Sequence, residues 1–180
     1  MTVYATLDSP LGELLLVGEE SATAKGGTAL VSLSMPGQKG AAAVRDGWRR
    51  APEAFEEITR QLRSYFGGEL TRFEIEYAPG TGTAFQRQVW AELDAIPYGT
   101  TLSYGEIARR IGASSVKVRA VGTAIGRNPA LVVRPCHRVI GSDGTLKGYA
   151  GGLERKEHLL GLEGALVAAS GSADALVGPH

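Results

Sequence analysis

Residues 78–82 read Ala-Pro-Gly-Thr-Gly and separate two halves of different character in a chain of 180 residues. Proline lacks a backbone N–H and glycine is conformationally permissive, so this run suits neither a helix interior nor a strand interior. At about 150 residues per domain, the length allows one domain or two small ones. We predict two domains, at residues 1–79 and 84–170, with a linker at 80–83 and a flexible tail at 171–180.

The first half has strand patterns followed by one helix. Residues 3–7 and 13–17 are apolar-rich runs separated by a Pro- and Gly-containing gap, which predicts a β-hairpin. A further strand is expected near residues 29–33. Apolar residues recur at helical spacing across 52–66, and residues 73–75 alternate as in a strand. These patterns predict a small α/β domain with an antiparallel sheet.

The second half has stronger helix signals. Capping boxes at residues 83–86 and 103–106 each predict the start of a helix. Gly112 ends the second helix, and a third is expected to begin at Ser114 or Ser115. Two short helices joined by a tight Gly-containing turn predict a helix-turn-helix, with a plain helical hairpin as the alternative. A mainly helical second domain makes the whole chain α+β.

Charge is unevenly distributed along the chain. The net charge is zero, from 19 Lys and Arg against 19 Asp and Glu, yet no acidic residue lies between Glu106 and Asp143. In a protein with no net charge, a segment with only positive charges indicates either a surface that binds a polyanion or a basic face exposed to solvent. The segment contains Arg109, Arg110, Lys117, Arg119, Arg127, Arg134 and Arg138.

Several protein classes are excluded by composition. There is no run of about 18 apolar residues, so no membrane span is expected. The N-terminal residues lack a basic region followed by an apolar core, so no signal peptide is predicted. One cysteine excludes an internal disulfide and a multi-cysteine zinc site, and no metal site is expected. We expect a cytoplasmic protein.

The lone cysteine, Cys136, has unusual neighbours. Arg134, His137 and Arg138 place positive charge beside the thiol, and positive charge favours the nucleophilic thiolate. A lone cysteine is commonly a small buried hydrophobe instead. In an extended backbone adjacent side chains point apart, so Cys136 and His137 need a turn or a bridging water to cooperate. Glu163 could orient the imidazole, or it could be a surface helix residue.

An apolar, β-prone run at residues 130–133 leads into the sequence Pro-Cys-His-Arg-Val at 135–139, and it predicts a short strand before the cysteine. The five-residue sequence resembles the signature of the O6-alkylguanine–DNA alkyltransferases, also called methylated-DNA–protein-cysteine methyltransferases. The resemblance covers residues 84–164 nearly continuously, and residues 1–79 only loosely. Its other motifs are Ile-Pro-Tyr-Gly at 96–99, Ser-Tyr-Gly-Glu-Ile-Ala at 103–108, Arg-Ala-Val-Gly at 119–122, Asn-Pro at 128–129, Gly-Tyr-Ala-Gly-Gly-Leu at 148–153, Lys156, Leu-Leu at 159–160 and Glu-Gly at 163–164.

The resemblance implies five catalytic residues. Cys136 accepts an alkyl group from guanine O6, His137 acts as base through a water, and Glu163 orients His137. Tyr104 donates to the leaving guanine as negative charge develops there. Asn128 ties the recognition helix to the cysteine segment. Taken alone, Tyr104 is equally an aromatic in the first turn of a helix, and Asn128 part of an Asn-Pro turn.

The resemblance also implies that the target nucleotide is flipped out of the duplex. Arg119 then fills the gap, although its pattern alone also suits a phosphate contact. The recognition helix enters the minor groove, where readout is degenerate and suits damage in any sequence. The implied DNA contacts are Arg119, Ala120, Gly122, Thr123, Tyr104 and Ser142. The implied substrate pocket is lined by Pro135, Val139, Tyr149 and Gly151.

The implied product is a thioether, which has no easy leaving path, so each molecule acts once. No cofactor is implied, because the damaged DNA is itself the alkyl donor. The implied partner is double-stranded DNA carrying O6-alkylguanine, with O4-alkylthymine as a further substrate. We expect a monomer that is able to cluster cooperatively on DNA. The chain departs from the family pattern at Arg134, where an apolar residue is usual.

Three other functions fit parts of the pattern. A non-catalytic sensor of alkylated bases needs no nucleophile, but Cys136 is present. A helix-turn-helix regulator needs a dimerisation element, and the sequence shows none. A cysteine hydrolase leaves the segment around Arg119 without a use.

Overall fold

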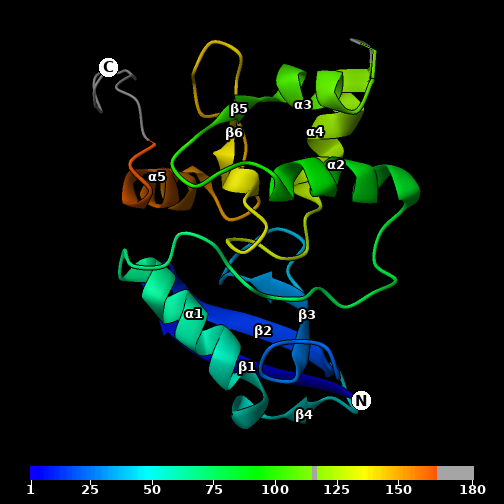
Figure 1. Cartoon of the computed structure of the whole chain (residues 1–180), viewed down its shortest axis with the longest axis vertical. Helices are drawn as coiled ribbons and strands as arrows, with labels where there is room; N and C mark the ends of the chain where they lie inside the picture. The colour runs from blue at the N-terminus through cyan, green and yellow to red at the C-terminus, as the bar shows by residue number, and fades with distance from the viewer. Residues whose placement is uncertain (115–116, 166–180) are drawn as a thin grey trace. The chain divides into compact units, whose positions relative to one another are not determined.

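The computed structural model describes residues 1–114 and 117–165 (Figure 1). A small sheet and several helices make the fold α+β, as predicted. The chain divides into two compact units, each described here by itself. Unit 1 comprises residues 1–81 and 129–133, and unit 2 comprises residues 82–128 and the chain from 134 onward. The expected tail at 171–180 lies outside the described residues.

Unit 1 contains a four-stranded sheet in the order β3-β2-β1-β4. Its strands are β1 (Thr2–Ser9), β2 (Gly12–Glu20), β3 (Thr28–Ser34) and β4 (Arg49–Arg50). The predicted hairpin forms from β1 and β2, and Gly12 at its turn has φ 104°, a conformation that glycine adopts without penalty. β2 and β3 are also antiparallel. The two-residue β4 pairs parallel to β1, which no sequence pattern indicates.

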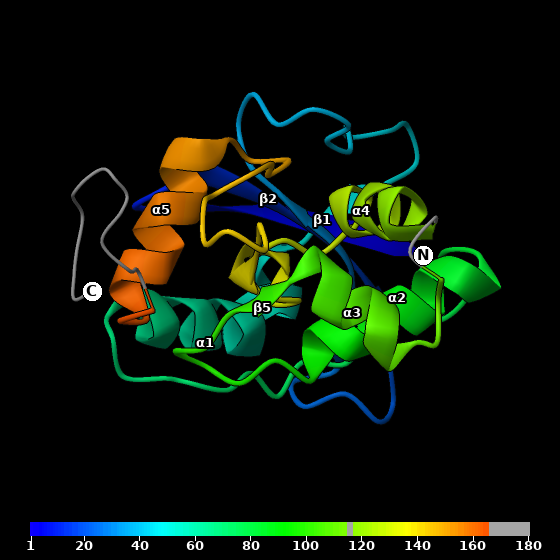
Figure 2. The ribbon, with the colours of Figure 1, turned by 90° about the horizontal axis from the view of Figure 1, so that it is seen from above.

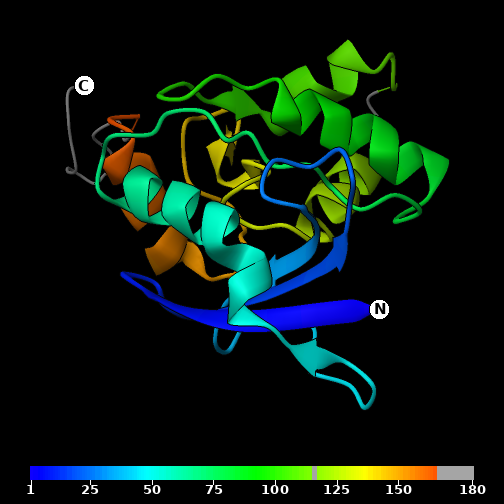
Figure 3. The ribbon, with the colours of Figure 1, turned by 60° about the horizontal axis from the view of Figure 1, so that its bottom comes forward.

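Helix α1 (Glu56–Phe66) follows a 3-10 turn, η1 (Pro52–Phe55), and lies across one face of the sheet (Figures 1 and 3). Its apolar face places Ile58, Leu62 and Tyr65 in the core, each 2% exposed or less. The core of unit 1 is therefore an ordinary apolar layer between a helix and a sheet.

Two expected strands do not form. Residues 73–75 carry no strand, because the side chain of Gln61 occupies the backbone groups of Glu74 in place of a neighbouring strand. The run at 130–133 contributes only an isolated bridge between Leu33 and Ala130. Val132 has φ 72°, which a β-branched residue rarely adopts and which cannot continue a strand.

Unit 2 is mainly helical. Its helices are α2 (Ala84–Asp94), α3 (Tyr104–Arg110), α4 (Val118–Gly126) and α5 (Leu153–Leu162), and β5 (Leu102–Ser103) pairs parallel to β6 (Val139–Ile140). Helices α2, α3 and α4 pack against one another (Figure 2). Both predicted capping boxes are present, at the starts of α2 and α3.

The third helix of unit 2 begins later than expected. Helix α4 begins at Val118 and not at Ser114, while Ser115 lies outside the described residues. Val121, Ala124 and Ile125 form the buried face of α4. This face packs α4 against α2 and α3, as a helix-turn-helix requires. Among the described residues, no helix is long and apolar enough to cross a membrane.

Candidate active site

The only cysteine of the chain begins a 3-10 turn, η3 (Cys136–Arg138), and Cys136 is 4% exposed. The turn is closed by a hydrogen bond from the Arg138 N–H to the Pro135 carbonyl, at 3.0 Å. A helical turn replaces the extended backbone in which the side chains of Cys136 and His137 point apart. The sequence alone allowed either an extended backbone or a turn at Cys136 and His137, and the structure has a turn.

Asn128 links the end of α4 to the cysteine segment. Its side-chain Nδ2 donates to the carbonyl of Arg134 at 2.9 Å, and the residue is 3% exposed. A hydrogen bond from the same side chain acts on the Cys136 thiol and lowers its pKa. The predicted tie between the recognition helix and the cysteine therefore has a geometric basis.

Glu163 follows the last residue of α5, and its side chain is fully buried. The Glu163 Oε2 lies 2.7 Å from Nε2 of His137. Arg138 donates to the same carboxylate from Nε at 2.7 Å and from Nη2 at 3.0 Å. The alternative of a surface helix residue is thus wrong for Glu163, and the predicted partner of His137 lies where it was expected.

The carboxylate of Glu163 also sets the tautomer of His137. An ionised carboxylate only accepts hydrogen bonds, so Nε2 of a neutral His137 ring carries the proton and Nδ1 keeps its lone pair. Nδ1 is buried and has no hydrogen-bond partner among the described residues. Burial lowers the pKa of His137, against the opposing effect of Glu163. The ring is therefore a neutral base with an available lone pair.

The thiol is protonated at rest. Burial raises the pKa of Cys136 from 9.0 to about 11, although Asn128, Lys156 and Arg134 all act to lower it. A buried thiol with this pKa becomes a strong nucleophile only when a base removes its proton. The neutral imidazole of His137 is the base next to it in the chain.

Lys156 is a site residue that the sequence did not assign. It is fully buried in α5, and its Nζ donates to the Gly148 carbonyl at 2.9 Å. Nζ lies 5.9 Å from the ring centre of Tyr104. Burial lowers the pKa of Lys156 to about 8. Beyond the family motif, residue type predicts an exposed side chain here, because buried lysines are rare.

Tyr104 is the first residue of α3 and faces α4. Burial raises its pKa, and a hydrogen bond with the backbone of Gly148 acts in the opposite direction. A Cβ at Gly122 would lie 3.9 Å from the Tyr104 ring, so α4 approaches the tyrosine closely. The predicted donor therefore lies within a group that includes Lys156, and its charge interacts with that of Cys136.

The predicted DNA contacts are mostly exposed. Arg119, Ala120 and Thr123 lie on the exposed side of α4, Gly122 is half-buried, and Ser142 is exposed in the loop after β6. This exposed side is opposite to the buried face that packs on α2 and α3. A helix that presents a basic residue and small side chains to solvent suits close approach to a nucleic-acid backbone.

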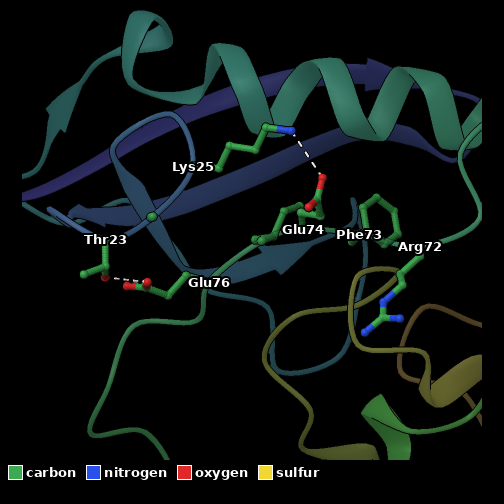
Figure 4. Close-up of a pocket in the computed structure, with 8 residues that line it drawn as sticks. Thr23, Lys25, Arg72, Phe73, Glu74 and Glu76 are labelled. Atoms are coloured by element: carbon green, nitrogen blue, oxygen red, sulfur yellow. Dashed lines mark hydrogen bonds and ion pairs between the residues drawn. The ribbon is translucent and has the colours of Figure 1, made fainter.

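The predicted pocket residues are closer to the core. Pro135, Val139 and Gly151 are buried, and Tyr149 is half-buried. None of them lines the shallow pocket of about 630 Å³ found in unit 1, at residues 23–25 and 72–76. Figure 4 shows the ion pair of Lys25 with Glu74 in that pocket, at 3.2 Å, and the hydrogen bond of Thr23 to Glu76. Among the described residues, no group of three or more His, Cys, Asp or Glu side chains could hold a metal ion.

The fold and the site define a class of protein: a buried cysteine followed by a histidine that is paired with a buried carboxylate, carried by a domain that contains a helix-turn-helix. Two family models match the chain. The DNA-binding domain of 6-O-methylguanine DNA methyltransferase matches residues 84–165, and its ribonuclease-like domain matches residues 2–79. The chain therefore belongs to the 6-O-methylguanine DNA methyltransferase family.

Individual relatives agree with this assignment. A methylated-DNA–protein-cysteine methyltransferase of Mycolicibacterium paratuberculosis is 50% identical over 163 residues, which cover 91% of this chain and 93% of the relative. One from Methanosarcina acetivorans is 49% identical over 161 residues, covering 89% and 97%. The crystal structure of Mycobacterium tuberculosis OGT in complex with DNA is 47% identical, with a TM-score of 0.80, and covers 93% of this chain and 96% of that one.

Proposed function

We propose that this protein repairs DNA by moving the alkyl group of O6-alkylguanine onto Sγ of Cys136. The observation that carries the proposal is the His137 ring, held by Glu163 at 2.7 Å through Nε2, with an Nδ1 that has no hydrogen-bond partner among the described residues. His137 directly follows the only cysteine of the chain. The relatives' names and the DNA-bound structure of one relative support the same activity.

The reaction is a displacement at the alkyl carbon. Nδ1 of His137 takes the thiol proton through a bridging water, and Sγ of Cys136 attacks the carbon. The C–O bond breaks and its electron pair stays on guanine O6. Tyr104 gives a proton to the guanine as negative charge develops, so the proton gained at His137 balances the proton given by Tyr104.

The ammonium group of Lys156 stabilises charge during this transfer. Lys156 lies near the Tyr104 ring and its charge also favours the Cys136 thiolate. With a pKa of about 8, Lys156 is mostly protonated at neutral pH. One ammonium group therefore stabilises negative charge first on sulfur and then at the proton donor.

The product ends the activity of the molecule. A thioether on Cys136 has no easy leaving path, and the chain has no second cysteine to exchange with it. Each protein molecule therefore repairs one base, and the alkylated DNA is both partner and alkyl donor. O4-alkylthymine presents a similar ring oxygen and is a further substrate. The protein acts as a monomer that clusters cooperatively on DNA.

The target base reaches the buried thiol by leaving the duplex. Arg119 on the exposed side of α4 enters the stack in its place, beside Ala120, Gly122 and Thr123, and Ser142 contacts the DNA backbone. Pro135, Val139, Tyr149 and Gly151 form the walls around the flipped base. The few kcal/mol that flipping costs are offset by DNA contacts of the helix-turn-helix.

One experiment tests the transfer directly. The protein is incubated with a duplex that carries a single O6-methylguanine, and its intact mass is measured together with a peptide map. We expect one added methyl group on Cys136, and none in Cys136→Ser. Binding without a mass gain would support a sensor, and sequence-specific binding to undamaged DNA would support a regulator. If the protein neither binds the duplex nor gains mass, a cysteine hydrolase is the remaining function.

A second experiment isolates base flipping. Arg119→Ala is compared with the wild type on the same duplex and on free O6-benzylguanine, which needs no flipping. We expect a far larger loss of rate on the duplex than on the free base. Equal losses on both substrates would remove Arg119 from the flipping step. Arg63→Ala, which removes an exposed arginine of α1 in unit 1, is the control and should leave both rates unchanged.

A further inference from the structure

Arg134, at the departure from the family pattern, is held by two residues of α2. Its Nε donates to the two carboxylate oxygens of Asp94, at 3.3 Å and 3.4 Å. Its guanidinium carbon lies 5.0 Å from the ring centre of Trp90. The Arg134 side chain is 10% exposed, whereas that of Asp94 is 35% exposed. A buried guanidinium stacked on an aromatic ring and paired with a carboxylate is a well-defined contact.

The backbone of the same residue faces the thiol segment. The Arg134 carbonyl accepts hydrogen bonds from the Cys136 N–H at 2.8 Å and from Nδ2 of Asn128 at 2.9 Å. Arg134 therefore connects α2, through its side chain, to the cysteine turn and the hinge asparagine, through its carbonyl. A displacement of its side chain would be transmitted to both groups.

The charge of Arg134 is only partly neutralised. Water screens the half-exposed carboxylate of Asp94 more than it screens the buried guanidinium. A residual positive field therefore acts on Cys136, two residues away. Other groups acting on the thiol are Lys156 from α5, Tyr104 from α3 and Asn128 after α4. The neighbouring His137 is itself paired with Glu163.

We propose that Arg134 is a positioning residue, and that its contacts with Asp94 and Trp90 hold the Cys136 turn on α2 while the balance of the Arg134 and Asp94 charges sets the reactivity of the thiol. The inference deepens the proposed alkyl transfer and rests on it. It assigns to Asp94, which does not touch the cysteine, a restraining effect on the thiolate.

The test uses two substitutions whose electrostatic effects have opposite signs. Arg134→Leu removes the positive charge, and Asp94→Asn removes the negative charge that opposes it. The rate of Cys136 alkylation by iodoacetamide is measured against pH, which is unambiguous because the chain has one thiol. We expect the midpoint of the profile to rise by about half a unit to one unit in Arg134→Leu and to fall by a smaller amount in Asp94→Asn.

A purely structural role predicts a different result. Both substitutions break the same ion pair, so loss of packing alone would shift both profiles in one direction or in neither, and that outcome would overturn the proposal. If Arg134→Leu does not fold, Arg134→Lys, which keeps the charge but not the planar fork, replaces it. The Lys variant should keep the wild-type midpoint, while Asp94→Asn still shifts downward.

The matched control is the exposed pair of Arg49 and Glu53 in unit 1, with a separation of 3.1 Å. Arg49→Leu and Glu53→Gln should leave the midpoint unchanged. Single-turnover rates with O6-benzylguanine should follow the order of the iodoacetamide rates across the variants. If the wild type reacts with iodoacetamide but not with O6-benzylguanine, the proposed function fails. The midpoints of the iodoacetamide pH profiles still decide the role of Arg134 in that case.

Discussion

The two units place their charged side chains in opposite ways. In unit 1 the ion pairs of Lys25 with Glu74, Arg49 with Glu53 and Arg60 with Glu57 lie at the surface, around an apolar core. Among the described residues of unit 2, five Arg, Lys, His or Glu side chains are buried: Arg134, His137, Arg138, Lys156 and Glu163. Burying such groups costs free energy unless they are paired, so unit 2 gives up stability that unit 1 keeps.

The difference shows where the chemistry is located. A surface ion pair is worth little and its loss is tolerated, whereas a buried network holds each member in one geometry and one protonation state. The network of unit 2 fixes the tautomer of His137 and places an ammonium group near Tyr104. Unit 1 has no comparable group among its described residues, so we regard it as a stable support.

The largest effect is expected from Glu163→Gln. The amide leaves Arg138 and His137 facing a neutral group in the core, which should cost about 3–5 kcal/mol of unfolding free energy. The alkyl-transfer rate should fall as well, because the amide no longer fixes the His137 tautomer. Denaturant unfolding and single-turnover kinetics measure the two effects. Glu57→Gln is the matched control, since Glu57 accepts a hydrogen bond from Arg60 at the surface. A similar loss in both variants would break the contrast between the units.

The second-largest effect is expected from truncating one buried leucine in each unit. Leu62 in α1 and Leu93 in α2 are both fully buried, so Leu62→Ala and Leu93→Ala should each cost about 2–5 kcal/mol. Measured at a temperature where both variants are folded, only Leu93→Ala should slow alkyl transfer, because α2 carries Asp94 and Trp90. A rate loss in Leu62→Ala would mean that unit 1 takes part in the chemistry.

Local features of this fold were predictable from the sequence. The hairpin of β1 and β2, the helix before Gly67 and both capping boxes depend on residues within a few positions of one another. The cysteine and its basic neighbours were equally visible. The return of residues 129–133 to unit 1 was not, because a short apolar run indicates burial but not the partner that buries it.

The charged network was only partly predictable. Glu163 lies 26 positions from His137 and 25 from Arg138, and no periodic pattern connects them. The family resemblance supplied the pairing of His137 with Glu163. It did not supply the second partner, Arg138, or the burial of Lys156. Arginine and lysine side chains are rarely buried, so the sequence alone does not predict these contacts.

A third prediction concerns Lys156→Met, which replaces a buried ammonium with an apolar chain of similar length. Below about pH 8 the folded state holds a charge that the unfolded chain exposes to water, so the variant should be more stable by about 1–4 kcal/mol. The alkyl-transfer rate should nevertheless fall, because the positive charge near Tyr104 and Cys136 is lost. Thermal unfolding and single-turnover rates measure both. A variant that is less stable and equally fast would contradict the idea that unit 2 sacrifices stability for chemistry.

The pH dependence of this difference has a defined sign. The pKa of Lys156 is lowered from 10.5 to about 8 on folding, so the unfolded state binds more protons above pH 8 and the wild type gains stability as pH rises. The pKa of Cys136 is raised from 9.0 to about 11, and this group reduces stability above pH 9. Both proteins contain Cys136, so the gap between the wild type and Lys156→Met depends on Lys156 and should narrow between about pH 8 and 10.5.

The smallest effect is expected from removing the N-cap side chain of either of two helices of unit 2. Thr83 and Ser103 both cap helices through complete capping boxes, so Thr83→Ala and Ser103→Ala should each cost about 1 kcal/mol. Ser103 immediately precedes Tyr104, and its cap fixes the first turn of the helix that carries the proposed proton donor. Only Ser103→Ala should therefore lower the alkyl-transfer rate, by a few-fold, with the thiol pH profile unchanged. Equal rates in the two variants would show that the position of Tyr104 is set by the packing of its ring, near Gly122 and Lys156, and not by the start of α3.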